Sequence, residues 1–212
     1  MGHSIGEYSA LVASSMVSFE DAMRLVHARG QLMAACSTSK DLGMVALKLS
    51  SPFSEFSKFF EEHSELQVDI AGINSSTQIV VSGLKTEIDD LVKELKSLIA
   101  RSAPLYNVSH PFHSRYMKHA RDHFGAELDR VQFHPPNGVV VSNVTGEPAD
   151  HQEFPKLLQE QITLPVMWKP SIDHALTFPN VTFIEVGPKK VLSNLLRQDG
   201  IECKPLGCYG NH

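Results

Sequence analysis

Gly2-His3-Ser4-Ile5-Gly6-Glu7 opens the chain and fits the pattern Gly-x-Ser-x-Gly directly before a helical pattern. In a nucleophile elbow of this kind the serine lies on a strained turn between a strand and a helix, with its hydroxyl exposed. Glycines flank the serine because only small residues let such a turn close. The motif therefore predicts Ser4 as a nucleophile. A buried strand must precede such an elbow and only Met1 stands there, so we expect either that the chain is a fragment or that the protein begins further upstream.

The composition indicates a globular protein and excludes several classes of function. The 212 residues suit one domain or a domain with an insert, and 42% hydrophobic and 20% charged residues are ordinary for such a protein. A net charge of −5 argues against a nucleic-acid binder but leaves room for local basic patches that meet an acidic protein. No run of about 18 apolar residues exists to span a membrane. Cys36, Cys203 and Cys208 have no zinc-site spacing, so we expect free thiols and no metal.

Two helices are predicted after the elbow, at residues 7–14 and 19–36, with Ser18 as the N-cap of the second. Apolar residues recur at helical spacing on one face of the second helix. Arg29 falls on that face, and Arg24 does not. A guanidinium stays charged and is costly to bury unless it is paired. Periodicity alone favours an Arg29 that reaches water or pairs with a structural carboxylate, and the functional alternative is a bound carboxylate or phosphate.

The middle of the chain has its own order of elements, β-α-β-β-α-β, which is the ferredoxin-like arrangement. The expected strands and helices cover residues 44–47, 53–63, 66–73, 78–82, 85–100 and 103–108. We therefore predict a small subdomain over residues 43–109, inserted between two parts of a larger body, residues 1–42 and 110–212. A stripe of phenylalanines in its first helix is expected to be core.

The body is predicted to be an α/β structure with a parallel sheet covered on both faces, because strands and helices alternate in it. Helices are expected at residues 114–128, 153–162, 170–175 and 191–197, and strands at 139–142 and 181–186. The serine needs a base, and His113 stands out among eleven histidines. It lies at the junction of the subdomain and the next body helix, where a crevice is expected. His110 shares that neighbourhood, so spacing alone leaves both histidines open.

At this point the motifs resemble those of the malonyl-CoA:acyl carrier protein transacylases and of the acyltransferase domains of polyketide and fatty acid synthases. The resemblance covers nearly the whole chain, and the matching motifs occur in the same order. The matching segments are Gly2–Leu11, Arg29-Gly30-x-x-Met33, Asn74 with 78–83, Phe112-His113-Ser114, 161–168 and Glu185-Val186-Gly187-Pro188. The resemblance implies an α/β-hydrolase-like parallel-sheet body with an inserted ferredoxin-like subdomain.

Site roles follow from the resemblance. Ser4 would be the nucleophile and His113 the base that takes its proton. Gln161 would supply a carbonyl that orients His113, where hydrolases use a carboxylate. Arg29 would clamp the free carboxylate of a malonyl group, and the Ile5 backbone N–H would give half of the oxyanion hole.

Further residues are implied with less definite roles. Met33 and Asn74 belong to matching motifs and are expected to line the substrate site, whereas His3 is expected to be structural. Phe112 resembles the malonyl-type version of the histidine motif, so malonyl is favoured over methylmalonyl. Candidates for a basic surface that docks acidic acyl carrier protein, with ordinary solvated charges as the alternative, are Arg115, Lys118, Lys189, Lys190 and Arg197.

The resemblance implies transfer of a malonyl group from malonyl-CoA to the phosphopantetheine thiol of acyl carrier protein in fatty acid synthesis, through a malonyl-serine intermediate and ping-pong kinetics. No cofactor beyond these substrates, no nucleic acid and no membrane are expected, and the family is usually monomeric. The compartment would be mitochondrial in a eukaryote and cytoplasmic otherwise.

Two departures from the family leave alternatives open. The family runs about 90 residues further upstream and there carries a Gly-x-Gly-x-Gln motif that completes the oxyanion hole, whose loss typically slows such enzymes about 10²–10³-fold. Lys189 stands where the family usually has glycine. We therefore expect a truncated chain of transacylase ancestry. The alternatives are an α/β-hydrolase esterase and an inactive fragment or scaffold that binds acyl carrier protein.

Overall fold

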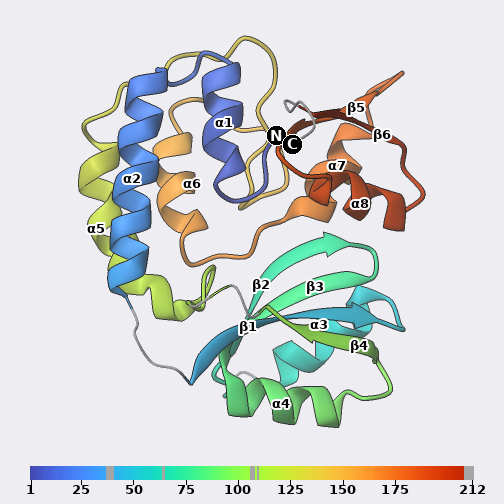
Figure 1. Ribbon diagram of the computed structural model, residues 1–212. Coiled ribbons are helices and arrows are strands. Elements are labelled where there is room, and N and C mark those ends of the chain that lie inside the picture. Colours follow the sequence, from blue (N-terminus) through green and yellow to red (C-terminus); the bar gives the residue numbers. More distant parts are fainter. Residues whose placement is uncertain (37–40, 64, 106–107, 109, 208–212) are drawn as a thin grey trace.

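The computed structural model describes residues 1–36, 41–63, 65–105, 108 and 110–207. Figure 1 shows two parts: a helical body that carries both chain ends, and a smaller sheet-and-helix subdomain below it. The elements in chain order are α1 (Gly6–Ala13), α2 (Phe19–Ala35), β1 (Leu42–Leu49), α3 (Phe53–Glu62), β2 (Val68–Ser75), β3 (Gln78–Leu84), α4 (Lys85–Glu94), β4 (Ile99–Pro104), the 3-10 turn η1 (Arg115–Met117), α5 (Lys118–Leu128), α6 (Phe154–Gln161), α7 (Trp168–Ala175), β5 (Phe183–Gly187), α8 (Val191–Gln198) and β6 (Cys203–Gly207).

Helices α1, α2, α5 and α6 pack side by side in the body (Figure 1). Ser18 caps α2 as predicted, since its Oγ accepts the Asp21 N–H. The shared core of these helices is apolar and closed to solvent, and its larger members include Tyr8, Leu25, Phe124 and Phe154. Burial of these apolar side chains stabilises the body, because apolar area removed from water is the dominant favourable term in folding.

The subdomain is a four-stranded antiparallel sheet in the order β2-β3-β1-β4, with α3 and α4 beside it. Strand β3 pairs with both β1 and β2, and β1 pairs with β4. The sequence of elements is the predicted β-α-β-β-α-β. The phenylalanine stripe of α3 is core as expected, because Phe56 is buried and Phe53, Phe59 and Phe60 pack against the same cluster.

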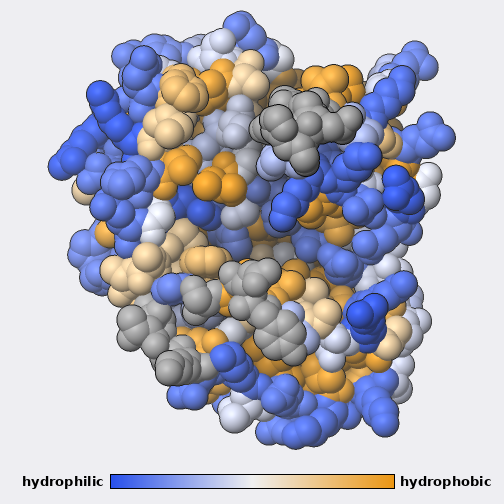
Figure 2. Space-filling view, in the orientation of Figure 1, coloured by the Kyte–Doolittle hydropathy of each residue, from blue (hydrophilic) through white to orange (hydrophobic). Residues whose placement is uncertain are grey.

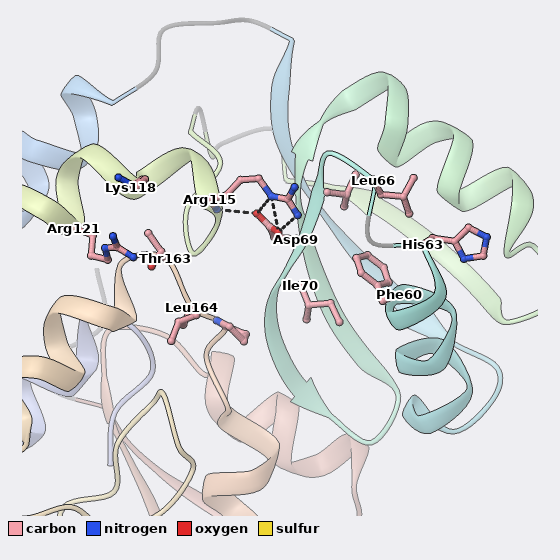
Figure 3. Close-up of a pocket in the computed structure, with 12 residues that line it drawn as sticks. Phe60, His63, Leu66, Asp69, Ile70, Arg115, Lys118, Arg121, Thr163 and Leu164 are labelled. Atoms are coloured by element: carbon pink, nitrogen blue, oxygen red, sulfur yellow. Dashed lines mark hydrogen bonds and ion pairs between the residues drawn. The ribbon is translucent and has the colours of Figure 1, made fainter.

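Several contacts join the subdomain to the body along β2. The Ile73 N–H donates to the Val166 carbonyl, and the Val166 N–H donates to the Ala71 carbonyl. Asp69 accepts a forked pair of bonds from the Arg115 guanidinium, as Figure 3 shows. At the far end of the strand, the turn after β2 bonds to the last turn of α8. In Figure 2 apolar residues lie in patches on both the body and the subdomain, with polar residues between and around them.

The parallel pairing predicted for the body is present in β5 and β6, which lie together at the edge of the molecule. The predicted strand at residues 139–142 is wrong. Val141 forms only an isolated bridge with Pro148, because the backbone of this segment turns back on residues 147–149 instead of meeting a neighbouring strand. The β5–β6 pair leaves Ile184, Val186 and Leu206 more than half exposed.

Several predicted boundaries are also wrong. The helix expected over residues 85–100 ends at Glu94, since Leu95 caps it and Leu98 closes a turn onto Leu95. The strand expected over residues 103–108 runs from Ile99 to Pro104, and residues 106–107 lie outside the described part of the chain. Strand β6 was not predicted, because its five residues lack any apolar alternation. Within the described residues no helix is long and apolar enough to cross a membrane.

Candidate active site

Ser4 lies at the sharp turn that leads into α1, and its backbone is in the left-handed region with φ of 52°. A non-glycine residue holds that conformation only where its surroundings impose it, and such strain gathers at functional sites. The turn is tight on one side: a Cβ on Gly2 would lie 1.9 Å from the Gly6 carbonyl oxygen. A Cβ on Gly6 would meet nothing within 4 Å, so close packing requires glycine only at Gly2.

His113 lies directly against the serine. Its Nε2 is 2.7 Å from the Ser4 Oγ, and its Nδ1 is 2.8 Å from the main-chain carbonyl of Gln161. A carbonyl only accepts, so Nδ1 carries the ring proton and Nε2 presents a lone pair to the serine hydroxyl. The geometry is that of a nucleophile and a base held in the correct tautomer. His113 shares the strained backbone of Ser4, with φ of 56°.

The surroundings keep His113 neutral. Burial lowers the pKa of its imidazole from 6.5 to about 3, and the positive charge of Arg29 acts in the same direction. At neutral pH the ring is therefore an unprotonated base. His110, the alternative histidine, is half-buried, and its Nε2 lies 3.2 Å from the Ala34 carbonyl.

Arg29 reaches the same point from α2. Its side chain is 7% exposed, and one terminal nitrogen donates to the Ser4 Oγ at 3.2 Å and to the Gln161 Oε1 at 3.1 Å. Its Nε is buried and has no hydrogen-bond partner in the described structure. No carboxylate forms an ion pair with Arg29 among the described residues. A buried cation with an unused donor next to a nucleophile is suited to bind an anionic substrate group.

Two residues at the centre of the site were missed by the sequence analysis. The Glu7 carboxylate is 1% exposed; it accepts the Asn143 N–H at 2.8 Å and a short bond from the Gln161 Nε2. Asn143 accepts the Ser4 N–H at 2.6 Å and donates to the Gly2 carbonyl at 2.6 Å. An acid in the first turn of a helix is normally a surface feature, so the sequence gives no sign that Glu7 is buried.

Burial raises the pKa of Glu7 to about 7, against the opposing effects of its hydrogen bonds from Asn143 and Gln161 and of the nearby Arg29 charge. The same burial lowers the pKa of Arg29. The site thus holds a carboxylate, a guanidinium and a neutral imidazole in a space shielded from water.

The Ile5 backbone N–H lies at the start of α1, one residue after Ser4. In the described part of the chain it donates to no protein acceptor, whereas the next three N–H groups bond to the carbonyls of His3, Ser4 and Ile5. A free N–H at a helix N-terminus beside a nucleophile is the kind of donor that stabilises a developing oxyanion.

The remaining residues predicted to line the substrate site, Asn74, Phe112 and Met33, make contacts of other kinds. The Asn74 Oδ1 is 2.9 Å from the His3 Nε2, which agrees with a structural role for that histidine. Phe112 is half-buried and stacks on the His110 ring. Met33 lies one turn after Arg29 on the buried face of α2 and belongs to the body core.

The five cations expected to form one docking surface lie on two separate parts of the molecule. Arg115 and Lys118 belong to η1 and α5, whereas Lys189, Lys190 and Arg197 lie at α8 on the opposite side (Figure 1). Figure 3 shows the first pair at a cavity of about 560 Å³ between α5 and the subdomain. Here Arg115 is bound to Asp69, and Lys118 pairs with Asp122 at 2.9 Å.

That cavity does not contain the reactive centre, because Ser4, Arg29 and His113 are not among its lining residues. Within the described residues no group of three or more histidine, cysteine, aspartate or glutamate side chains could hold a metal ion. Cys36 and Cys203 are free thiols, and Cys208 lies outside the described residues.

Comparisons with known proteins agree with this geometry. The family described as "Acyl transferase domain" matches residues 1–206. The malonyl CoA-acyl carrier protein transacylase of Staphylococcus aureus (strain MRSA252) is 38% identical over 201 residues, which are 93% of this chain and 65% of that protein.

Two solved structures are also similar. MCAT from Streptococcus pneumoniae has a TM-score of 0.88 at 32% identity, over 96% of this chain and 67% of that one. A type II PKS acyl-carrier protein in complex with its malonyl-transacylase matches with a TM-score of 0.86 at 28% identity, over 99% of this chain and 68% of that one. This chain thus spans about two thirds of the length of these relatives. The extent and identity of these matches show that the chain belongs to the acyl transferase domain family.

Proposed function

We propose that this protein transfers a malonyl group from malonyl-CoA to the phosphopantetheine thiol of an acyl carrier protein, in fatty acid synthesis, through an ester on Ser4. The observation that carries the proposal is the convergence of three groups on one oxygen. The Ser4 Oγ lies 2.7 Å from a neutral imidazole nitrogen of His113 and 3.2 Å from a buried guanidinium nitrogen of Arg29.

The first half of the reaction forms the acyl-enzyme. The Ser4 Oγ attacks the thioester carbonyl carbon while His113 Nε2 takes its proton. The tetrahedral oxyanion accepts a hydrogen bond from the Ile5 N–H. The C–S bond then breaks, and the departing CoA sulfur takes the proton from His113. The second half is the reverse: the phosphopantetheine thiol gives its proton to His113, its sulfur attacks the ester, and Ser4 Oγ leaves with that proton.

Arg29 would select the acyl group. Its unpartnered Nε can donate to one carboxylate oxygen, and the terminal nitrogen can turn the N–H that now faces the Ser4 Oγ to the other, so that the two donors form a fork. An acetyl group would leave this charge buried and unpaired, which disfavours it. Burial is the main cause of the low pKa of His113 and the Arg29 charge adds to it; a malonyl carboxylate would neutralise that charge and so strengthen the base during the reaction.

The relatives support this choice of substrates, since the S. aureus protein is named for malonyl CoA and acyl carrier protein. The esterase alternative has less support. The partner of the His113 Nδ1 is a main-chain carbonyl, whereas the hydrolase pattern uses a carboxylate there. A scaffold without activity remains the other outcome of the test below. The monomeric state and the compartment stay predictions, and the relatives named, which are bacterial where an organism is given, offer no support for a mitochondrial location.

The test is a comparison of two transfer reactions on the purified chain. Radiolabelled malonyl-CoA and acetyl-CoA are supplied with holo acyl carrier protein, and p-nitrophenyl acetate serves as the esterase substrate. We expect malonyl transfer to exceed both acetyl transfer and ester hydrolysis. Hydrolysis that exceeds thioester transfer would favour the esterase. Binding of the carrier protein by a cooperatively folded chain that is never acylated would favour the scaffold.

A further inference from the structure

Glu7 is a buried carboxylate that the proposed reaction does not use. It does not contact His113 or the Ser4 hydroxyl, and it forms no ion pair with Arg29. Its two oxygens are instead divided between two N–H donors: one accepts from the Asn143 backbone and the other from the Gln161 side chain. Desolvation of a carboxylate is costly, so a buried one with this arrangement calls for an explanation.

The bond from Gln161 to Glu7 fixes which way the Gln161 amide faces. Its Nε2 has two acceptors, the Glu7 carboxylate and the Ser4 main-chain carbonyl at 3.2 Å. Its Oε1 then faces Arg29 and accepts from the guanidinium at 3.1 Å. If the Gln161 amide were flipped, its Oε1 would face the Glu7 and Ser4 oxygens, and its NH₂ would face the donors of the Arg29 guanidinium. Only one orientation therefore satisfies all three contacts.

We propose that Glu7 is a positioning residue that fixes the Gln161 amide and, through it, the direction in which Arg29 presents its guanidinium to the acyl group. The identity of the acyl group in this inference rests on the proposed function. The positions of Glu7, Gln161 and Arg29 rest on the contacts alone. Asn143 and Gln161 hold the carboxylate in place, so it cannot close on Arg29 as an ion-pair partner. The unpartnered Arg29 Nε thus stays available for a carboxylate substrate.

Glu7→Gln is nearly isosteric and breaks this arrangement. The new amide must keep an oxygen toward the Asn143 N–H, so its NH₂ faces the Gln161 NH₂. The Gln161 amide then has two choices. It either stays, so that its NH₂ faces the new NH₂ at position 7, or it flips, so that its NH₂ faces the Arg29 donors. The loss of one hydrogen bond to a charged group corresponds to about 1.5 kcal/mol, or roughly tenfold in a ratio of rate constants.

The kinetic experiment measures kcat/KM for malonyl-CoA and for acetyl-CoA in the wild type, Glu7→Gln and Glu20→Gln. Glu20 is an exposed glutamate at the start of α2, so Glu20→Gln controls for the same chemical change. We expect Glu7→Gln to lower the malonyl-to-acetyl ratio about tenfold, mainly through the KM for malonyl-CoA, and Glu20→Gln to leave it unchanged. A double-mutant cycle with Arg29→Ala should be non-additive, because Glu7 would act through the guanidinium that Arg29→Ala removes.

An unchanged malonyl-to-acetyl ratio in a folded Glu7→Gln variant would overturn the proposal. So would an equal fall in kcat/KM for both thioesters that is additive with the effect of Arg29→Ala in the double variant. Gln161→Met provides the same test if Glu7→Gln does not fold. It keeps the main-chain carbonyl for His113 but removes the amide link, so the ratio should again fall. A ratio unchanged in Gln161→Met would also overturn the proposal.

A spectroscopic measurement separates this inference from the proposed function. In ¹⁵N-labelled protein, the Gln161 side-chain N–H signals are assigned by their absence in Gln161→Met. We expect one of them to lie downfield in the wild type and to move in Glu7→Gln but not in Glu20→Gln. A failure of malonyl-CoA to acylate the wild type would sink the proposed function, and these signals would still decide the role of Glu7. Signals that do not move in Glu7→Gln would overturn that role whatever the activity.

Discussion

Replacement of Arg29 by alanine should reverse the acyl preference of the site. Arg29 is 7% exposed, and its Nε lacks a partner among the described residues, so a malonyl carboxylate would receive two charged hydrogen bonds in a space shielded from water. Each such bond contributes about 1.5–3 kcal/mol, so both together contribute about 3–6 kcal/mol. Their loss should lower kcat/KM for malonyl-CoA about 10²–10⁴-fold.

Acetyl-CoA should respond in the opposite direction. Arg29→Ala removes a buried charge that an acetyl group leaves unpaired, so its kcat/KM should be maintained or rise. The assay is the rate of acyl-enzyme formation on Ser4, followed by rapid quench and intact-protein mass spectrometry with each thioester.

Arg24→Ala is the matched control for this experiment. Arg24 lies on the same helix, its side chain is 77% exposed, and it pairs only with Asp21 at the surface. Its removal should leave both rates unchanged. Retention of the malonyl preference in a folded Arg29→Ala variant would refute the assignment of Arg29 as the carboxylate clamp.

Three further outcomes are expected. Gly2→Ala should lower the melting temperature strongly, because the added Cβ would lie 1.9 Å from the Gly6 carbonyl oxygen, whereas Gly30→Ala meets no atom within 4 Å inside α2 and should stabilise the chain by about 1 kcal/mol. The free energy of unfolding should fall as pH falls from 6.5 toward 3, because the pKa of His113 is lowered to about 3 in the folded state and the unfolded chain takes up the proton first. His113→Asn should remove this dependence, which amounts to roughly 1.4 kcal/mol per pH unit. The ratio of kcat/KM for malonyl-CoA to that for acetyl-CoA should fall as pH falls through about 7, where Glu7 takes up a proton. In Glu7→Gln this ratio should not change with pH over that range. A wild-type ratio that is flat between about pH 5.5 and 8 would contradict the role given to the Glu7 carboxylate.

The opposite signs of the His113 and Glu7 effects on stability help to separate them. The pKa of Glu7 is raised to about 7 in the folded state, so its contribution to stability is present at low pH and is lost as pH rises from about 4.5 to 7. Below about pH 4.5 only His113 of this pair still changes stability with pH.

The elements of the subdomain were predictable because each carries a clear period. The alternation in β3 and the helical spacing of Ile88, Leu91 and Leu95 follow from one buried face each. The end of α4 was not predictable in the same way, since Leu98 continues the helical spacing beyond the last helical residue. The strand expected at residues 139–142 failed because a run of valines does not reveal whether a neighbouring strand exists to pair with it, and only Val140 and Val141 of the run are buried.

The site residues also differ in whether the sequence alone could reveal them. Ser4 was marked by its own motif, whereas the functional role of Arg29 and the choice of His113 over His110 came only from the family resemblance. Glu7 and Asn143 were missed, because each fits an ordinary local role and their importance comes from partners more than 130 residues away. The cations expected on one docking surface lie on two parts of the molecule, because charge along the sequence does not show that the fold separates η1 and α5 from α8.

The most direct test of the central claim is the intact mass of the purified chain after incubation with malonyl-CoA, measured for the wild type and for Ser4→Ala. The wild type should gain the mass of one malonyl group and lose it when holo acyl carrier protein is added. Ser4→Ala should gain nothing while it unfolds with the same cooperativity. A cooperatively folded wild type that gains no mass, or a Ser4→Ala variant that gains the same mass, would contradict acyl transfer through Ser4.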